Sequence, residues 1–148
     1  MTQWSLILAA FATGALVPLQ LVFNGQLGGV TRNAFTASLI VFLIGASVLA
    51  AMVVIMRPPL PTVSSLIAAP KTVWLGGLIA TAYIIAIVVI TPRLGVGLTT
   101  ALILVGQLCM ALALDHFGAF GNPQQTLSIG RAVGLSLMIV GVVTIKSS

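Results

Sequence analysis

The sequence predicts an all-α, polytopic membrane protein built as a bundle of five transmembrane helices. Three observations predict this fold: 59% of the 148 residues are hydrophobic, only 5% are charged, and the hydrophobic residues form five long runs. Soluble domains carry about 25% charged residues, so this chain has too few polar side chains to cover a water-facing surface. We therefore expect a single transmembrane domain over residues 1–148, with lipid as the solvent for most of it.

The first three runs are separated by a short turn and by a proline-rich loop. Each run is long enough to cross a bilayer, which takes about 20 apolar residues in a helix. We expect the first two spans at residues 4–27 and 35–56. The prolines that follow mark a loop up to Lys71, because proline cannot continue a helix without loss of a hydrogen bond. We expect the third span at residues 73–90, ending at the sequence Thr-Pro-Arg of residues 91–93.

The last two spans are joined by a polar, glycine-rich link. We expect these spans at residues 96–114 and 129–145, and the link begins with Asp115 and His116. Asp115 is the only carboxylate side chain in the sequence, at the end of the fourth span. It is therefore either the one candidate for proton coupling or a structural residue that caps the helix or pairs with Arg131 or His116.

The six Lys and Arg residues lie singly, at or near the ends of the runs. A nucleic-acid footprint needs basic residues clustered on one face, so the net charge of +5 predicts contact with lipid headgroups and no nucleic-acid binding. With five spans, the N-terminal side carries three basic residues and the opposite side the other three: Arg57, Lys71 and Arg131 against Arg32, Arg93 and Lys146. This balance gives no preferred orientation under the positive-inside rule. Either other signals orient the chain, or it inserts both ways up.

Polar side chains form a stripe along the first predicted span. Thr13, Gln20 and Asn24 fall on one face at 100° per residue. Pro18 lies among them and deprives the Gly14 carbonyl of its helical hydrogen bond. A kinked helix with a polar stripe suits a substrate path, although Gln and Asn also hold neighbouring helices together in structural bundles.

The later spans supply further candidates for a cavity wall and for a helix interface. Thr100 and Gln107 share a face of the fourth span, and Tyr83 stands above small residues on the third. Close packing of the helices is the other reading of that small-residue face. Gly134 and Gly141 leave a groove on the fifth span for a partner helix, which predicts a dimer interface. We expect Gln20, Asn24, Tyr83 and Gln107 to bind substrate.

The residue types that carry out catalysis do not form a recognisable set. The sequence holds one histidine, one cysteine and one carboxylate side chain, and therefore neither paired carboxylates nor a histidine cluster. Cys109, as the only cysteine, can form neither an intrachain disulfide nor a cysteine-based metal site. We expect no enzymatic activity, no catalytic residues, no metal and no cofactor.

Several stretches resemble the YdcZ-type family of inner-membrane exporters, which belongs to the drug/metabolite transporter superfamily. The match keeps the order of the motifs over nearly the whole chain. Its parts are the sequence GALVPLQLVFNGQLG at residues 14–28, WLGGL at 74–78, PRLG at 92–95, Gly106-Gln107, DHFG at 115–118 with Gly121, and Arg131 with Gly134 and Gly141.

The resemblance implies a multi-pass protein of a bacterial inner membrane that exports a small molecule. It implies one five-helix half of a ten-helix inverted-repeat transporter, which works by alternating access as a dimer. The dimer is either a homodimer, in a parallel or an antiparallel arrangement, or a heterodimer with a paralogous half. The last helix also resembles the dimer-forming helix of small multidrug resistance proteins. Those carry an essential Glu in their first helix, whereas this chain has no Glu and Gln20 cannot titrate. The alternative function is a non-transporting subunit that supports assembly or stability of a partner membrane protein.

Overall fold

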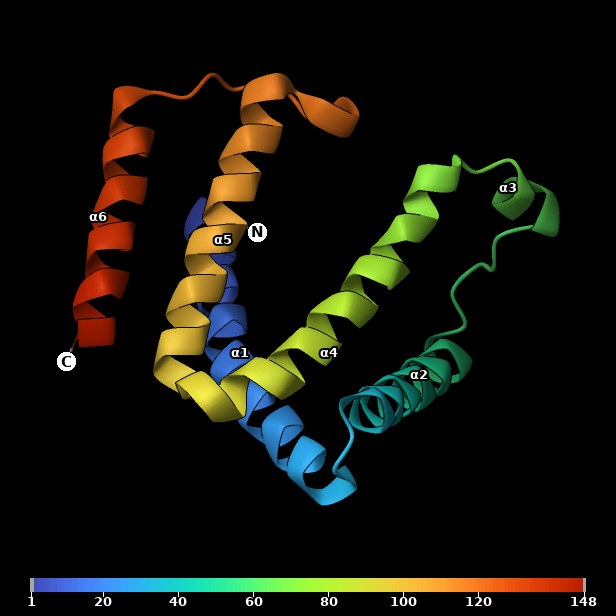
Figure 1. The fold of residues 1–148 in the computed structure, drawn as a ribbon. Coiled ribbons are helices and arrows are strands. Elements are labelled where there is room, and N and C mark those ends of the chain that lie inside the picture. The colour runs from blue at the N-terminus through green and yellow to red at the C-terminus, as the bar shows by residue number, and fades with distance from the viewer. Residues whose placement is uncertain (1, 148) are drawn as a thin grey trace. The chain divides into compact units, whose positions relative to one another are not determined.

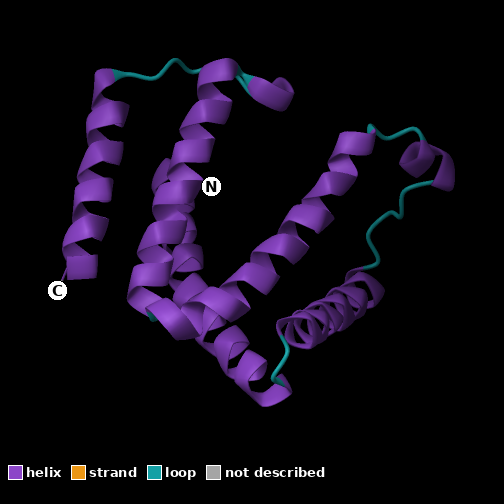
Figure 2. Cartoon of the chain, in the orientation of Figure 1, coloured by secondary structure: helices purple, strands orange, loops and turns teal. Residues whose placement is uncertain are grey.

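The structure is a computed structural model that describes residues 2–147, and helices dominate that range (Figures 1 and 2). No strand occurs among these residues. Five helical segments are long and apolar enough to cross a membrane, which confirms the predicted fold class. They are α1 (Gln3–Thr31), α2 (Ala34–Met56), Lys71–Leu94 (which ends with α4, Leu75–Leu94), α5 (Val96–Phe117) and α6 (Ile129–Ser147).

The chain divides into two compact units, Met1–Arg93 and Leu94–Ser148. The first unit contains α1, α2 and α4, with the short helix α3 (Val63–Ile67) and the 3-10 turn η1 (Lys71–Trp74) in the connection before α4. The second unit contains α5 and α6, with the 3-10 turn η2 (Ala119–Gly121) between them.

A tight turn joins α1 to α2, and the two helices contact each other. Arg32 ends α1 in the left-handed backbone conformation, with φ of 53°. Asn33 then caps α2, because its side-chain oxygen accepts a hydrogen bond of 3.0 Å from the backbone N–H of Thr36. Ala37 and Ser38, in the first turns of α2, are buried. The turn therefore fixes the start of α2 beside the end of α1.

Helices α1 and α4 approach closely through glycine. A Cβ added to Gly28 would lie 2.6 Å from Val88 Cγ1, and one added to Gly25 would lie 3.5 Å from Pro92 Cγ. Val88 and Ile84 of α4 are buried. The approach requires glycine at position 28, where a Cβ would overlap Val88, whereas a Cβ at position 25 would be in ordinary contact with Pro92. Small residues allow such close contacts between membrane helices.

Helix α4 continues through Pro92, whereas the sequence led us to expect its end at residues 91–93. Proline has no N–H to donate to the carbonyl of Val88, but its fixed φ is compatible with helical geometry. The helix ends at Leu94, and Gly95 follows with φ of 80°, a conformation that favours glycine.

In the second unit, α5 and α6 lie side by side (Figure 1). The link between them folds back over the end of α5. Gly118 ends α5 in the left-handed conformation, with φ of 57°. The backbone N–H of Gln125 donates to the Asp115 carbonyl at 2.8 Å, and the Gln124 side chain donates to the His116 carbonyl at 3.0 Å. These bonds satisfy carbonyls that the last turn of a helix leaves without helical partners.

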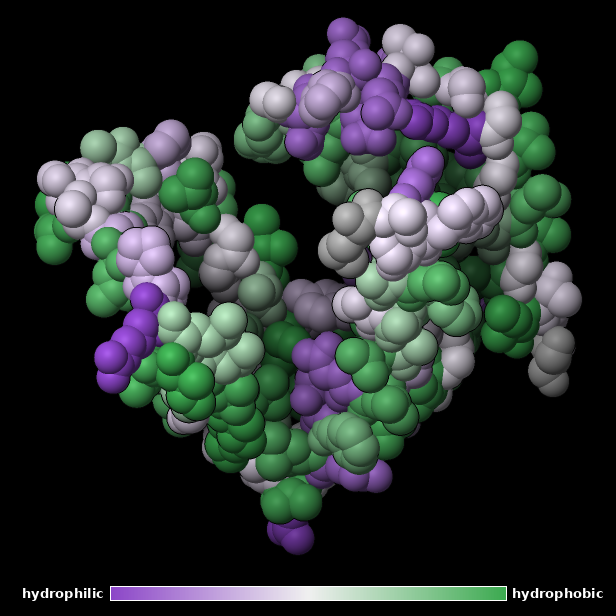
Figure 3. Space-filling model, turned by 180° about the vertical axis from the view of Figure 1, so that it is seen from behind, coloured by the Kyte–Doolittle hydropathy of each residue, from purple (hydrophilic) through white to green (hydrophobic). Residues whose placement is uncertain are grey.

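Most apolar side chains face outward, as expected of a chain whose solvent is lipid. Large exposed hydrophobic residues occur on every spanning helix, and few residues are buried. Figure 3 shows hydrophobic side chains over much of the helix surface, with hydrophilic residues gathered in small patches. Burial in the first unit concentrates where α1, α2 and α4 meet.

Candidate functional site

The sequence-predicted substrate residues differ in burial. Asn24 is buried on α1, and Tyr83 is half-buried on α4 in the same unit. Gln20 on α1 and Gln107 on α5 are exposed, and neither side-chain amide bonds another residue that the structure describes. An amide exposed to hydrocarbon is costly. Within residues 2–147 these two glutamines are thus unpaired, and they line neither of the two cavities described below.

Two buried polar groups of the first unit have no hydrogen-bond partner among the described residues. They are Nδ2 of Asn24, on a residue 6% exposed, and Oγ1 of Thr91, on a residue 4% exposed. Each stands next in sequence to a residue of the α1–α4 contact, since Asn24 precedes Gly25 and Thr91 precedes Pro92. A buried polar atom left unpaired costs about 1–3 kcal/mol, so both groups are available for a ligand or a water molecule.

Thr91 is a candidate that the sequence analysis missed. Other membrane threonines satisfy their hydroxyl by donating to the carbonyl four residues earlier. Thr81 does so to Gly77 at 2.8 Å, and Thr99 to Gly95 at 2.7 Å. Thr91 makes no such bond although it is buried. The only signal in the sequence was its place directly before Pro92 inside an apolar run.

A cleft of about 350 Å³ opens in the first unit, at the end of α1, the start of α2 and the end of α4. Two arginines and an asparagine provide its polar lining, and glycines and aliphatic residues provide the rest. The residues that line this arginine cleft are Gly25, Gly28, Gly29, Arg32, Asn33, Ala34, Val88, Val89, Pro92 and Arg93. Both arginines were expected at span ends, but nothing in the sequence indicated that they line one cleft.

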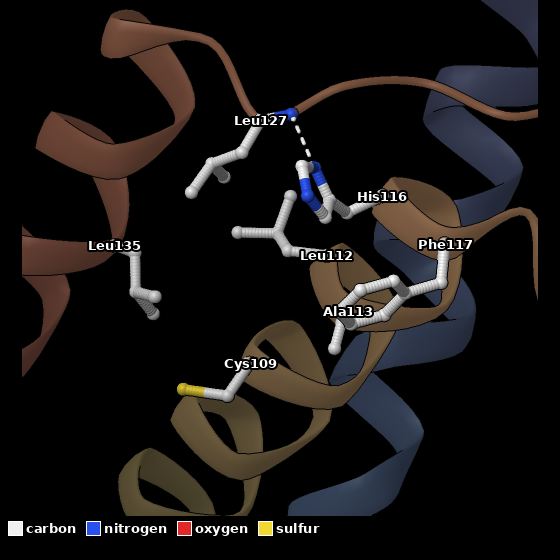
Figure 4. A pocket seen from close by; sticks show the side chains of 7 residues that line it. All are labelled: Cys109, Leu112, Ala113, His116, Phe117, Leu127 and Leu135. Atoms are coloured by element: carbon white, nitrogen blue, oxygen red, sulfur yellow. Dashed lines mark hydrogen bonds between the residues drawn. The ribbon is translucent and has the colours of Figure 1, made fainter.

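The second unit holds an apolar pocket of about 230 Å³ between α5, the link and α6 (Figure 4). Nδ1 of His116 accepts a hydrogen bond of 3.2 Å from the backbone N–H of Leu127, which closes one end of it. The side chains of Cys109 and Leu135 face the same space from α5 and α6. None of the sequence-predicted substrate residues lines this pocket.

Asp115 lies at the end of α5, where it faces Arg131 of α6. Its Oδ2 atom is 3.9 Å from Arg131 Nη1, and both side chains are partly exposed. Arg131 also donates a hydrogen bond to the Gln125 side chain in the link. The pair with Arg131, one of the structural roles predicted for Asp115, is therefore present.

The two glycines predicted to form a dimer interface are exposed on α6. No described atom lies within 4 Å of the position that a Cβ would take at Gly134 or at Gly141. This stretch of α6 is thus open along the described part of the chain.

The comparisons with known proteins give one result, for the family. A sequence model of the family described as "Putative inner membrane exporter, YdcZ" matches residues 5–144. No curated protein and no solved structure matches the chain. The family resemblance predicted from the sequence motifs is confirmed.

Proposed function

Because this chain belongs to the YdcZ family of inner-membrane exporters, we propose that it moves a small molecule across that membrane by alternating access, as one half of a dimer. Membrane export is not an enzyme class, and the proposal involves binding and conformational change only. The observation that carries it is a pair of buried polar groups on Asn24 and Thr91, beside the contact between α1 and α4, that have no hydrogen-bond partner in the described part of the chain.

These groups support a binding role better than a purely structural one. A structural Asn or Thr in a membrane bundle normally pairs with a neighbouring helix or its own backbone. The Nδ2 atom of Asn24 and the Oγ1 atom of Thr91 do neither among the described residues. A substrate that hydrogen-bonds them would recover the 1–3 kcal/mol or so that each unpaired group costs.

The substrate site in this proposal is neutral and hydrogen-bonding. Asn24 and Thr91 form its centre, and Gln20 and Tyr83 supply a further amide and a phenol group from α1 and α4 of the same unit. Gln107 of α5 stays a predicted substrate residue of the second unit. None of these side chains carries a charge at neutral pH. Such a lining suits a substrate recognised through hydrogen bonds and apolar contact.

Dimer formation would cover polar and small residues that a single chain exposes. Gln20 and Gln107 are exposed on apolar helices, where contact with lipid tails is costly. Gly134 and Gly141 offer α6 as a surface for close approach. The equal numbers of basic residues on the two sides agree with two copies inserted in opposite orientations. A heterodimer with a paralogous half would cover the same exposed residues.

The test is uptake into proteoliposomes that contain the purified full-length protein, with a panel of cationic, neutral and amino-acid-like compounds, with and without a pH gradient. Asn24→Leu and Thr91→Val remove the unpartnered groups and keep similar volumes. Thr81→Val is the matched control on α4, because the Thr81 hydroxyl already bonds the Gly77 carbonyl and is exposed. We expect transport to fall at least tenfold in the first two variants and to stay near wild type in the third.

Two outcomes oppose the proposal. If no compound is transported by wild-type protein that is folded and correctly inserted, the alternative of a non-transporting partner subunit gains support. If Asn24→Leu and Thr91→Val transport as well as Thr81→Val, the two buried groups do not contact substrate.

A further inference from the structure

The arginine cleft concentrates positive charge at one end of the first unit. Arg32 follows the last residue of α1, and Arg93 lies in the last turn of α4. They are far apart in the sequence, yet both line the same cleft of about 350 Å³. The turn at Arg32 and the contact of Gly25 with Pro92 bring them together.

Neither guanidinium group has a carboxylate partner among residues 2–147. Asp115 is the only acidic side chain in the sequence, and it pairs with Arg131 in the second unit. Among the described residues, the side chains of Arg32 and Arg93 also make no hydrogen bond to protein. Two like charges at one cleft repel each other, so an anion bound between them would be stabilised by both.

The start of α2 adds to the attraction for an anion. Ala34, the first residue of this 23-residue helix, lines the cleft beside its cap, Asn33. The first N–H groups of a helix have no helical acceptor, and the helix dipole favours negative charge there. The first turn of α2 contains no Asp or Glu that would neutralise the positive end of the helix dipole.

The position and the other walls of the cleft indicate the source of the anion. Three membrane helices end or begin at it, which is the depth where lipid headgroups lie. Val88, Val89 and Pro92 form an apolar wall next to the arginines. A phospholipid presents a phosphate directly beside its apolar chains, which matches this arrangement of polar and apolar walls.

We propose that the arginine cleft binds the phosphate group of an anionic phospholipid between Arg32 and Arg93. The part of an acyl chain nearest the headgroup then packs against Val89 and Pro92. The ligand chemistry is a phosphate group, and the lipid is its source. This lipid site does not depend on the proposed transport function, because lipid binding at the cleft requires only the folded protein.

The experiment measures lipid binding by the purified full-length protein in detergent. Thermal unfolding is followed during titration with phosphatidylglycerol, with phosphatidylcholine of the same acyl chains, or with inorganic phosphate. A ligand that binds only the folded protein raises the unfolding temperature according to its concentration and affinity. We expect phosphatidylglycerol to stabilise the wild type more than phosphatidylcholine does, and inorganic phosphate to have no effect at millimolar concentration.

Variants assign the effect to the cleft. Arg32→Gln/Arg93→Gln should weaken phosphatidylglycerol binding about thirtyfold, at ~1 kcal/mol for each basic residue at the membrane surface. Arg57→Gln is the matched control, because Arg57 also ends a membrane helix in the left-handed conformation but does not line the cleft. We expect that control to change the affinity less than twofold.

A second variant protects the test against loss of folding in the double arginine variant. Gly29→Leu adds a side chain at a cleft residue that has no described atom within 4 Å of its Cβ position, and it leaves both arginines in place. It should lower phosphatidylglycerol binding at least tenfold. The proposal is overturned if wild type shows no preference for phosphatidylglycerol, if Arg57→Gln matches the double variant, or if Gly29→Leu binds normally. Equal stabilisation by inorganic phosphate would overturn the lipid as the source.

Discussion

Replacement of Gly28 by alanine tests the contact between α1 and α4. The new Cβ would lie 2.6 Å from Val88 Cγ1, whereas carbon atoms in contact prefer about 3.5 Å or more. The shortfall is therefore roughly 0.9 Å. Valine in a helix has one strongly preferred χ1 rotamer, so Val88 cannot swing aside without cost. The backbone oxygen of Val88, 3.7 Å away, limits movement on the same side.

The expected cost follows from a comparison with the neighbouring glycine. Overpacking of a buried site costs about 1–3 kcal/mol, and the greater helix propensity of alanine returns up to about 1 kcal/mol. Gly29→Ala gains the same propensity and meets no atom within 4 Å. We therefore expect Gly28→Ala to be less stable than Gly29→Ala by about 1–3 kcal/mol, because the propensity gain cancels in the comparison.

The assay is unfolding of the purified protein in mixed micelles with rising SDS, followed by circular dichroism. The double variant Gly28→Ala/Val88→Ala removes the Cγ1 atom and should recover most of the lost stability. The reasoning is refuted if Gly28→Ala equals or exceeds Gly29→Ala in stability. If Gly28→Ala is unstable but the double variant does not recover, the contact with Val88 is not the cause.

Three further predictions concern topology, assembly and coupling. Reporter fusions at the C-terminus should show both orientations, and one added Lys in either set of loops should shift the mixture; a single fixed orientation would contradict dual insertion. Gly134→Leu/Gly141→Leu should lower cross-linking between copies, because the new side chains fill the open groove on α6; unchanged yields would exclude α6 as the contact. Asp115→Asn should lower the free energy of unfolding by at most about 1 kcal/mol, because the ion pair with Arg131 is partly exposed and 3.9 Å long. The variant should keep any pH-driven transport. Loss of proton coupling in a stable variant would make Asp115 the proton carrier.

The five membrane helices could be predicted because each depends on local information. An apolar run of sufficient length has few other ways to satisfy its backbone in lipid than to form a helix. The exact helix ends and the short helices could not be predicted, because they depend on weaker local signals. Pro92 suggested a helix end because proline usually breaks helices, yet α4 continues to Leu94. Helix α3 lies in the predicted loop, where Thr62 caps it by accepting a hydrogen bond from the Ser65 N–H.

The candidate site was only partly accessible to sequence reasoning. Asn24 stood out because a carboxamide inside a membrane helix is costly wherever it points. Thr91 did not, because a threonine in a helix usually bonds its own backbone, and only the structure shows that this one does not. The arginine cleft required tertiary information. Arg32 and Arg93 each read as an ordinary residue at a span end until the contact of α1 with α4 placed them together.

One contact therefore underlies both proposals made for the first unit. Gly25 and Gly28 let α1 approach α4, and Asn24 and Thr91 are buried beside that contact. Gly28 and Val88 also line the arginine cleft. Because the two sites share this packing, Gly28→Ala should weaken phosphatidylglycerol binding together with stability, whereas Asn24→Leu should affect transport and leave lipid binding unchanged. Unchanged phosphatidylglycerol binding in a destabilised Gly28→Ala variant would show that the contact between α1 and α4 does not support the arginine cleft.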